Sequence, residues 1–349
     1  MRKRRSDEKM ATTRYNAGIQ RAKGILQLAA SLYDGSLSYR TKRAAEGVLQ
    51  TDTRVGRVVR LSLGSKANER RKDITFSFAT GSFRQIIGVA DKKYSMAWVN
   101  PSVLLTMACR GKGPFRKRLP LRAIAVFPSW DVMGFAVHES TGITSLEQIA
   151  AQKLPLRVST GRIPKNDLGG NATMFTVSAV LKAAGFSLAQ MRRWGAKFHN
   201  APRPSDPSRR AAIESGAVNA IFDEGIKSWG QTALDNGFRY LPVTGKVLSQ
   251  LTRLGYRSAL LSNAHFRGLA RPVPTLDFSG WPMIVHADMA DEVAYALCEA
   301  IEHCRADFPT DNFKPLDIAQ LCANDDEAPF DAPLHPGAKR FYRERGFLK

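Results

Sequence analysis

The chain has 349 residues, of which 44% are hydrophobic, and it carries a formal net charge of +21. This length and hydrophobic content exclude a fibrous or disordered chain overall and allow one large or two medium cores. No stretch approaches the roughly 18 consecutive apolar residues that a membrane-spanning helix needs, so we expect a folded soluble protein that does not cross a membrane.

The charge is concentrated in the first third of the chain. Residues 1–130 contain 27 lysines and arginines against 8 acidic residues, a net charge of +19. Three basic clusters dominate this region: Arg2–Arg5, Arg70–Lys72 and Lys112–Arg118. Such clusters bind phosphates or attract acidic ligands, or they are solvated loops, and both interpretations stay open. Few aromatic residues lie between them, so a nucleic-acid partner is not favoured.

The N-terminal region predicts a basic helical extension over residues 1–53. The positive start Met1–Arg5 is followed by polar residues rather than by the apolar region of a signal peptide. Gly24–Tyr33 has apolar residues at helical spacing, which favours an amphipathic helix over a cleaved signal. A second helix is expected around Tyr39–Leu49.

Strands and helices then alternate, which predicts an α/β fold with mostly parallel sheets. In the first part, the expected strands are Val58–Leu63, Ile74–Ala79, Ser95–Val99, Leu121–Phe127 and Val132–Val137, with a short helix over Ser82–Val89.

The middle of the chain predicts a second α/β unit. Thr144–Glu147 matches a capping box for a helix that ends near Ala151. After a strand at Leu156–Ser159, the glycine-containing loop Thr160–Asn171 leads into the helix Met174–Ala184. Backbone N–H groups at that helix start are suited to receive an anion.

The remaining elements complete the two-lobed prediction. They are Arg209–Glu214, Lys227–Asn236 and Met289–Cys304 as helices, and Ala217–Phe222, Phe238–Val243 and Pro282–His286 as strands. We expect lobe 1 to comprise residues 54–138 and 245–349 and lobe 2 to comprise residues 139–244. In such proteins the ligand usually binds in the cleft between the lobes.

The four cysteines do not indicate a metal site. Cys109, Cys298, Cys304 and Cys322 lack the C-x-x-C spacing and the nearby histidine pair that zinc requires. We expect buried or half-buried free thiols and neither a metal nor an organic cofactor.

Four stretches are similar to segments of a known family. They are Leu121–Leu146, the tract after it that ends in AAGF at 183–186, the segment Glu214–Gly225 (ESGAVNAIFDEG) and the ending Pro333–Glu344 (PLHPGAKRFYRE). Together they resemble the TAXI-type solute receptors of TRAP transporters. The ending is the most specific of them, and the resemblance covers roughly Ile74 to the C-terminus.

The resemblance implies a type II periplasmic binding-protein fold, in which two lobes close on a small organic anion such as a carboxylate. It also implies TRAP-type membrane subunits as partners and a periplasmic location, while the absence of a clear signal peptide keeps a cytoplasmic location open. The implied ligand contacts are Thr80, Gly81, Ser82, Asn100, Thr160, Gly161, Arg162, Asn171, Thr173, Asp223 and Glu224.

Some of these residues have an ordinary structural interpretation as well. Asn100 precedes a proline and is suited to end a strand, and Asn171 is suited to cap the following helix. Arg162 and Lys165 are the only cations in the Thr160–Asn171 loop, where they either pair with a carboxylate or are solvated. Trp130 and Trp281 are suited to wall a cleft, but a buried aromatic residue is more often part of a core.

Two other classes of function stay open. A cytoplasmic regulator would use the basic N-terminal helices on DNA, although residues 15–50 lack a clear helix-turn-helix. An enzyme on the same fold, such as an aromatic-acid decarboxylase, would need an acid or base, for which the candidates are His138, His199, Asp223, Glu224 and His286. No catalytic spacing joins these residues, so we expect a binding protein rather than an enzyme.

Overall fold

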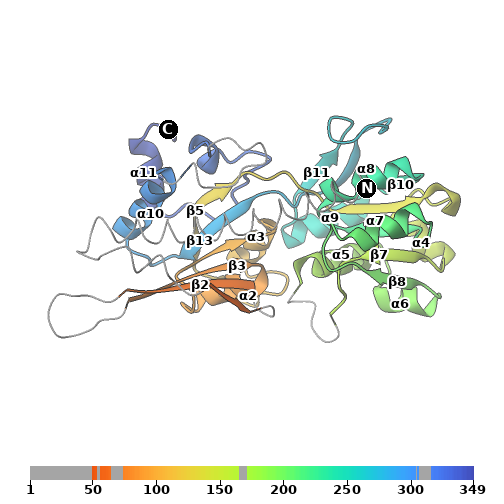
Figure 1. The fold of residues 1–349 in the computed structure, drawn as a ribbon, viewed down its shortest axis with the longest axis horizontal. Coiled ribbons are helices and arrows are strands. Elements are labelled where there is room, and N and C mark those ends of the chain that lie inside the picture. Colours follow the sequence, from red (N-terminus) through yellow and green to blue (C-terminus); the bar gives the residue numbers. More distant parts are fainter. Residues whose placement is uncertain (1–48, 53–55, 64–73, 165–170, 304, 306–315) are drawn as a thin grey trace, which may run out of the picture. The chain divides into compact units, whose positions relative to one another are not determined.

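A computed structural model describes residues 49–52, 56–63, 74–164, 171–303, 305 and 316–349 (Figure 1). The chain divides into two compact units. The first unit holds the described residues up to Val99 together with Leu119–Ser129 and Trp281–Lys349. The second unit holds Asn100–Arg118 and Trp130–Gly280.

The first unit is built on a six-stranded mixed sheet with the order β1-β2-β3-β4-β13-β5. Only β3 and β4 run parallel, and the other neighbouring pairs are antiparallel. The strands are β1 (Leu49–Asp52), β2 (Gly56–Leu63), β3 (Ile74–Gly81), β4 (Met96–Val99), β5 (Leu121–Phe127) and β13 (Trp281–His286).

Helices cover both faces of this sheet. Helix α2 (Phe83–Ala90) lies against one face, and α10 (Asp291–His303) and α11 (Pro336–Glu344) lie against the other (Figure 1). The short 3-10 helix Ala319–Cys322 contributes Leu321 and Cys322 to the same core as α10 and α11.

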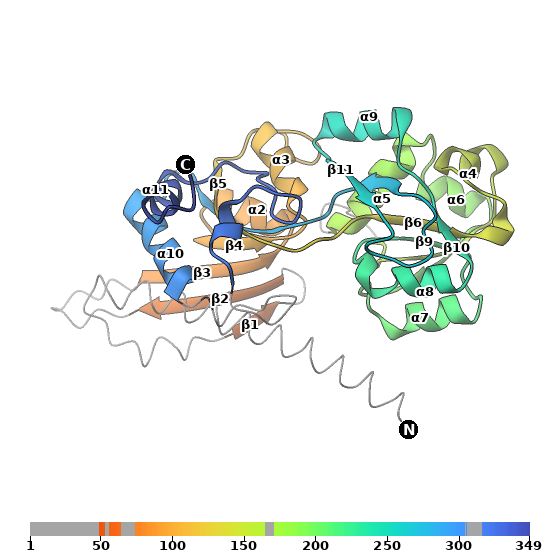
Figure 2. The ribbon, with the colours of Figure 1, turned by 90° about the horizontal axis from the view of Figure 1, so that it is seen from above.

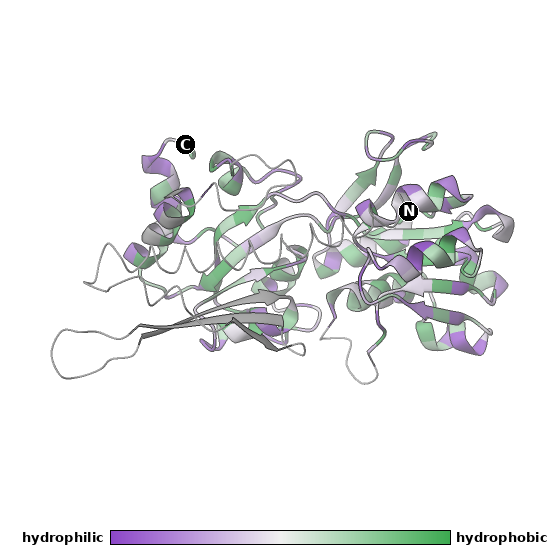
Figure 3. Cartoon of the chain, in the orientation of Figure 1, coloured by the Kyte–Doolittle hydropathy of each residue, from purple (hydrophilic) through white to green (hydrophobic). Residues whose placement is uncertain are grey.

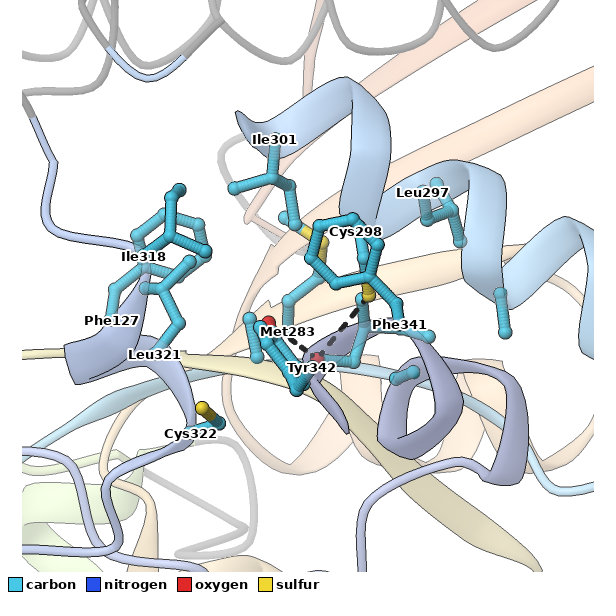
Figure 4. Packing of buried hydrophobic residues seen from close by; sticks show 14 of the residues in the cluster. Phe127, Met283, Leu297, Cys298, Ile301, Ile318, Leu321, Cys322, Phe341 and Tyr342 are labelled. Atoms are coloured by element: carbon cyan, nitrogen blue, oxygen red, sulfur yellow. Dashed lines mark hydrogen bonds between the residues drawn. The ribbon is translucent and has the colours of Figure 1, made fainter. Parts of the chain in front are cut away.

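An apolar cluster fills the space between α10, α11 and the sheet. Figure 4 shows Met283 of β13, Cys298 of α10 and Tyr342 of α11 pointing toward one another. The hydroxyl of Tyr342 donates a hydrogen bond to the carbonyl of Ile124 at 3.1 Å, so the polar end of the ring is satisfied inside the core.

The glycine of the LHPGA stretch is required by close packing. Gly337 lies in the first turn of α11, and a Cβ atom there would lie 2.0 Å from the carbonyl oxygen of Asp291 at the start of α10. His335 caps α11, since its Nδ1 accepts the N–H of Gly337 at 3.2 Å. This tight approach fixes the start of α11 against the start of α10.

The second unit contains a five-stranded mixed sheet with the order β10-β6-β9-β7-β8. The β9-β7-β8 part is parallel, while β6 runs antiparallel to both β9 and β10. The strands are β6 (Gly134–His138), β7 (Arg157–Thr160), β8 (Lys197–Asn200), β9 (Ala220–Asp223) and β10 (Phe238–Tyr240), and β11 (Ser258–Leu261) and β12 (Val273–Leu276) form a separate antiparallel pair.

Helices lie on both faces of the five-stranded sheet, with α5 and α6 on one side and α7 and α8 on the other (Figure 2). Strands β6 and β9 are mostly hydrophobic, whereas β8 (KFHN) is mostly hydrophilic and the helices show both hydrophobic and hydrophilic parts, as expected for elements that bury one face (Figure 3). The helices of this unit are α3 (Val103–Arg110), α4 (Leu146–Gln152), α5 (Ala172–Ala183), α6 (Leu188–Arg193), α7 (Pro207–Glu214), α8 (Gly230–Asp235) and α9 (Gly245–Leu254), with 3-10 turns at Glu139–Thr141 and Ile226–Ser228.

The structure confirms the α/β class and corrects details of it. The expectation of mostly parallel sheets is wrong for the first unit, because β13 returns between β4 and β5 and pairs antiparallel with both. The predicted capping box is displaced by one residue: Ser145 is the N-cap of α4, and Gln148 rather than Glu147 accepts the backbone N–H of Ser145, at 3.4 Å.

The lobe boundaries were expected at residues 138 and 244, whereas the compact units meet at 129/130 and 280/281, with Asn100–Arg118 also in the second unit. Residues 49–52 of the expected N-terminal extension form β1. The expected helices at Gly24–Tyr33 and Tyr39–Leu49 fall on residues 1–48, outside the described residues except for Leu49.

The cysteines behave as expected where they are described: Cys298 and Cys322 are buried and Cys109 is half-buried, and none of the three forms a disulfide. Cys304 lies outside the described residues. The side chains of the Lys112–Arg118 cluster are exposed, except that Phe115 in its middle is buried. Over the described ranges, no helix has both the length and the apolar character needed to cross a bilayer.

Candidate functional site

The candidate site lies at one edge of the sheet in the second unit. Strands β8, β7 and β9 are parallel neighbours, and Thr160 at the end of β7 is in register with Asn200 of β8 and Phe222 of β9. The loops after these strands therefore leave the sheet at the same edge. In open α/β sheets, ligands bind outside the carboxyl ends of parallel strands.

Thr160 and Gly161 form the start of the loop after β7. The Thr160 side chain is buried, and its Oγ1 donates to the carbonyl of Phe222 at 2.6 Å, which ties the end of β7 to β9. A Cβ atom at Gly161 would lie 3.8 Å from both carboxylate oxygens of Asp223, an ordinary contact distance. Gly161 is thus adjacent to Asp223 but is not required there by lack of space.

Asn171 caps helix α5, as one of its two interpretations expected. Its Oδ1 accepts the N–H of Met174 at 3.0 Å, and its Nδ2 donates to the carbonyl of Arg162 at 3.2 Å. The side chain therefore joins the two ends of the loop after β7. Arg162 is exposed and Thr173 is half-buried in the first turn of α5, while Lys165 lies outside the described residues.

A buried ion pair lies directly beneath this loop. Arg209 of α7 is fully buried, and its Nη2 pairs with the carboxylate of Asp223, the last residue of β9. The other Asp223 oxygen accepts the N–H of Glu224 at 2.9 Å. Burial raises the pKa of Asp223, and the positive charge of Arg209 opposes that rise.

Glu224 forms an acidic pair with Asp131, and both residues are half-buried. Its carboxyl group donates a hydrogen bond to Asp131, which also accepts the N–H groups of Val132 at 2.8 Å and Gly225 at 3.1 Å. Burial raises the pKa of Asp131 to about 6, and burial together with the adjacent Asp131 carboxylate raises the pKa of Glu224 well above its usual range.

Asp131 also lies against the segment that leaves the second unit. Its backbone N–H donates to the Oγ of Ser279 at 3.0 Å, and its carbonyl accepts the N–H of Phe278 at 2.9 Å. The Asp131–Glu224 pair therefore connects the end of β9 to both chain segments at the border of this unit.

The other expected ligand contacts lie at the ends of β3 and β4, where Thr80, Gly81 and Ser82 belong to the first unit and Asn100 to the second. Thr80 and Gly81 end β3, and Gly81 is in register with Val99 at the end of the parallel strand β4. Ser82 is the N-cap of α2, where its backbone N–H donates to the Oε1 of Gln85 at 2.9 Å. Asn100 follows β4 directly and has a cis peptide bond to Pro101, consistent with its interpretation as the end of a strand.

The histidines named as catalytic candidates each have a local partner. His138 Nδ1 accepts the N–H of Ser140, His199 Nδ1 lies 3.3 Å from the Oγ of Ser159, and His286 Nδ1 contacts the carboxylate of Asp288. His286 belongs to the first unit and the other two to the second. Among the described residues, no cluster of three histidine, cysteine or acidic side chains is arranged to hold a metal ion.

Of the two candidate tryptophans, Trp281 packs against the apolar core of the first unit. Trp130 packs against a core cluster of the second unit and stacks on His265, with ring centroids 3.9 Å apart. The core interpretation thus describes the contacts of both rings.

Three residues of the site, Ser159, Arg209 and Asp131, were not predicted from the sequence. A signal for Arg209 was present, because Arg209, Ala212 and Ile213 lie at i, i+3 and i+4 and all three are buried on one face of α7. An arginine on an apolar helix face predicts a buried partner. Asp131 had no comparable signal, since its partners come from segments far along the chain.

Two α/β units, each with polar residues gathered at the carboxyl ends of parallel strands, define a protein with a solute-binding receptor-like fold. Residues 54–346 match the model of the NMT1-like family, so the chain belongs to this family of periplasmic binding proteins. The family supports the expectation of a binding protein rather than an enzyme. No curated protein matches the chain.

Solved structures also match the chain, at low sequence identity. A structure described as a periplasmic transporter is 15% identical with a TM-score of 0.34, and the match covers 75% of this chain and 80% of that one. The Rpa4515 protein of R. palustris with adipate is 15% identical with a TM-score of 0.33, covering 73% and 74%. PhnD1 of Prochlorococcus marinus with methylphosphonate is 10% identical with a TM-score of 0.35, covering 75% and 82%.

Proposed function

We propose that the protein is a receptor that binds a small organic anion, such as a carboxylate, at the carboxyl edge of the sheet in its second unit. The observation that carries this proposal is the start of α5, which follows the glycine-containing loop after β7. The cap by Asn171 uses the N–H of Met174, and an α-helix leaves its other first N–H groups without partners inside the helix. These groups favour an anion.

The acidic side chains at this edge are compatible with an anionic solute because they are neutralised internally. Arg209 balances the charge of Asp223, and burial beside Asp131 raises the pKa of Glu224, which favours its uncharged form. Both effects reduce the negative charge at this edge. We propose Gly161, Arg162, Asn171 and Thr173 as the residues nearest to the solute.

The wider role that we propose is delivery of the solute to the membrane subunits of a TRAP-type transporter from a periplasmic location. Membership of the NMT1-like family supports the receptor part of this role. The assignment to the TAXI type and the transporter partner follow from the resemblance of the sequence, and co-purification with such membrane subunits tests them.

Asn171 offers the sharpest test of an anion at this edge. Aspartate caps a helix about as well as asparagine, so Asn171→Asp should retain the stability of α5, whereas Asn171→Ala should lose about 1 kcal/mol through the missing cap. The aspartate adds a negative charge where the solute charge is proposed to lie. We therefore expect Asn171→Asp to bind a carboxylate at least tenfold more weakly than Asn171→Ala does.

The measurement is isothermal titration calorimetry at pH 7 with dicarboxylates such as adipate, alongside thermal unfolding of each variant. Asp206, which caps α7 on the same unit, gives a matched control, because Asp206→Asn changes a capping charge away from α5. Equal affinities of the Asn171→Asp and Asn171→Ala variants would show that no anion binds near this helix start.

A further inference from the structure

The most unusual buried group of the second unit is the guanidinium of Arg209. Its exposed fraction is 0%, and it enters the interior from the buried face of α7. A charged group costs several kcal/mol to bury unless its charge and its hydrogen-bond donors are satisfied. The partners of Arg209 therefore indicate why the charge is there.

These partners come from three different segments at the carboxyl edge. Nε of Arg209 donates to the Oγ of Ser159 on β7 at 3.1 Å, and Nη1 donates to the carbonyl of Pro204, in the loop between β8 and α7, at 3.2 Å. Nη2 pairs with the carboxylate of Asp223 at the end of β9. One planar group thus connects the segments associated with the three parallel strands β8, β7 and β9.

Each partner lies next to a loop of the proposed site. Ser159 precedes Thr160 and Gly161, and Asp223 precedes Glu224. Pro204 also contacts the loop after β9, since a Cβ atom at Gly225 would lie 2.5 Å from the Cβ of Pro204. Gly225 has a φ of +63°, which favours glycine, so this loop is closely fitted against Pro204.

We propose that Arg209 is a positioning residue for the solute site: its guanidinium holds the loops after β7 and β9 and the loop before α7 in one fixed arrangement, with Asp223 as its counter-ion rather than as a ligand of the solute. This inference rests on the proposed function for the site, but the positioning itself does not require a bound solute. The rigid fork of arginine suits this role, because its donors point to separate acceptors in one plane, whereas lysine offers a single charged point.

The test separates positioning from simple stabilisation by replacing both members of the ion pair. Arg209→Met alone leaves Asp223 buried and unpaired and is expected to destabilise the fold strongly. The double variant Arg209→Met, Asp223→Leu removes both charges, and a buried pair replaced in this way often retains its stability. A purely stabilising pair would therefore be rescued completely by the double variant.

We expect the double variant to recover the thermal midpoint of the wild type but not the order of the loops. In hydrogen exchange followed by mass spectrometry, peptides that contain residues 160–163 and 224–226 should exchange at least tenfold faster than in the wild type, while peptides of α10 and α11 stay unchanged. Affinity for adipate, used as the probe, should fall at least tenfold. Wild-type exchange and affinity in a stable double variant would overturn the proposal.

Arg209→Lys provides a second route if the double variant does not fold. It keeps the charge opposite Asp223 but loses the fork, so the same peptides should again exchange at least tenfold faster, and wild-type exchange would again overturn the proposal. The neighbouring Arg210→Met is the matched control, because Arg210 is exposed and pairs with Glu214 on the helix surface. If the wild type does not bind adipate, the exchange data still decide the role of Arg209, and the failure falls on the proposed ligand.

Discussion

The interiors of the two units differ in the kind of group that they bury. In the first unit, the cluster around Tyr342 and Cys298 is apolar. The ion pairs Arg340–Glu292 and Arg345–Glu302, between the C-terminal segment and α10, lie nearer the surface. In the second unit, the guanidinium of Arg209 and the carboxylate of Asp223 are both buried beneath the loops of the candidate site. Burying a charge pair costs desolvation free energy that an apolar core does not, and this pair lies beneath the loops of the proposed site.

The most specific sequence signature and the proposed solute site lie in different units. The ending Pro333–Glu344, which is the most specific part of the resemblance, builds the core of the first unit through Gly337, Phe341 and Tyr342. The proposed solute site lies elsewhere, in the second unit. A sequence signature of this kind identifies the fold through its packing requirements and does not by itself locate the site.

The largest effect that we expect in the first unit comes from Gly337→Ala. The added methyl group would meet the backbone of Asp291, which cannot move as a flexible side chain could. We expect a loss of about 3 kcal/mol or more in the free energy of unfolding, measured by urea denaturation. The exposed neighbour Lys339→Ala is the control, and a similar small loss in both variants would show that α11 does not need this close contact.

A smaller effect, and one that depends on pH, is expected in the second unit from Asp131→Asn. The folded protein keeps a proton on Asp131 up to about pH 6, whereas the usual pKa is 3.8. Between these pH values the folded state binds more protons than the unfolded state, so Asp131 makes stability fall as the pH rises from about 4 through 6. The shift corresponds to about 3 kcal/mol.

The amide introduced by Asp131→Asn cannot titrate, so the variant should lose this part of the pH dependence, as measured by urea denaturation at pH 4.5 and pH 7.5. Glu224 is shifted in the same direction, and its own contribution should remain. Glu147→Gln, at an exposed position of α4, is the matched control. An unchanged slope in Asp131→Asn would contradict the raised pKa of this half-buried carboxyl group.

The smallest expected effect returns to the core of the first unit. Tyr342→Phe removes the hydroxyl that bonds to the carbonyl of Ile124 and should cost about 1 kcal/mol in the free energy of unfolding. Tyr295→Phe removes a comparable bond to Glu344, but at the surface, and should cost less. Equal costs in thermal unfolding would mean that burial does not strengthen the Tyr342 bond.

The sequence was informative about elements that are defined by local patterns. The apolar run Leu121–Phe127 coincides with β5, and the cap at Asn171 was one of the two interpretations that the sequence offered for that residue. Helix α3 was not predicted, since its sequence VLLTMACR is a short, mostly apolar run, which periodicity does not distinguish from a buried strand.

The pairing of strands that are distant in the sequence could not be predicted from local patterns. The antiparallel return of β13 between β4 and β5 depends on residues more than 150 positions apart, and no local pattern specifies it. The same limit applies to the site. Asp223 and Glu224 could be named as candidates from the sequence, but their partners Arg209 and Asp131 come close to them only in the folded chain. The role assigned to an acidic residue therefore changes once its neighbours are known.

The most direct test of the central claim is hydrogen exchange of the wild-type protein with and without each member of a panel of dicarboxylates, amino acids and aromatic acids. We predict that at least one carboxylate slows exchange in peptides covering residues 160–164 and 171–174, at the carboxyl edge of the second unit. Exchange that no member of the panel slows in these peptides would contradict the proposal that this edge binds an organic anion.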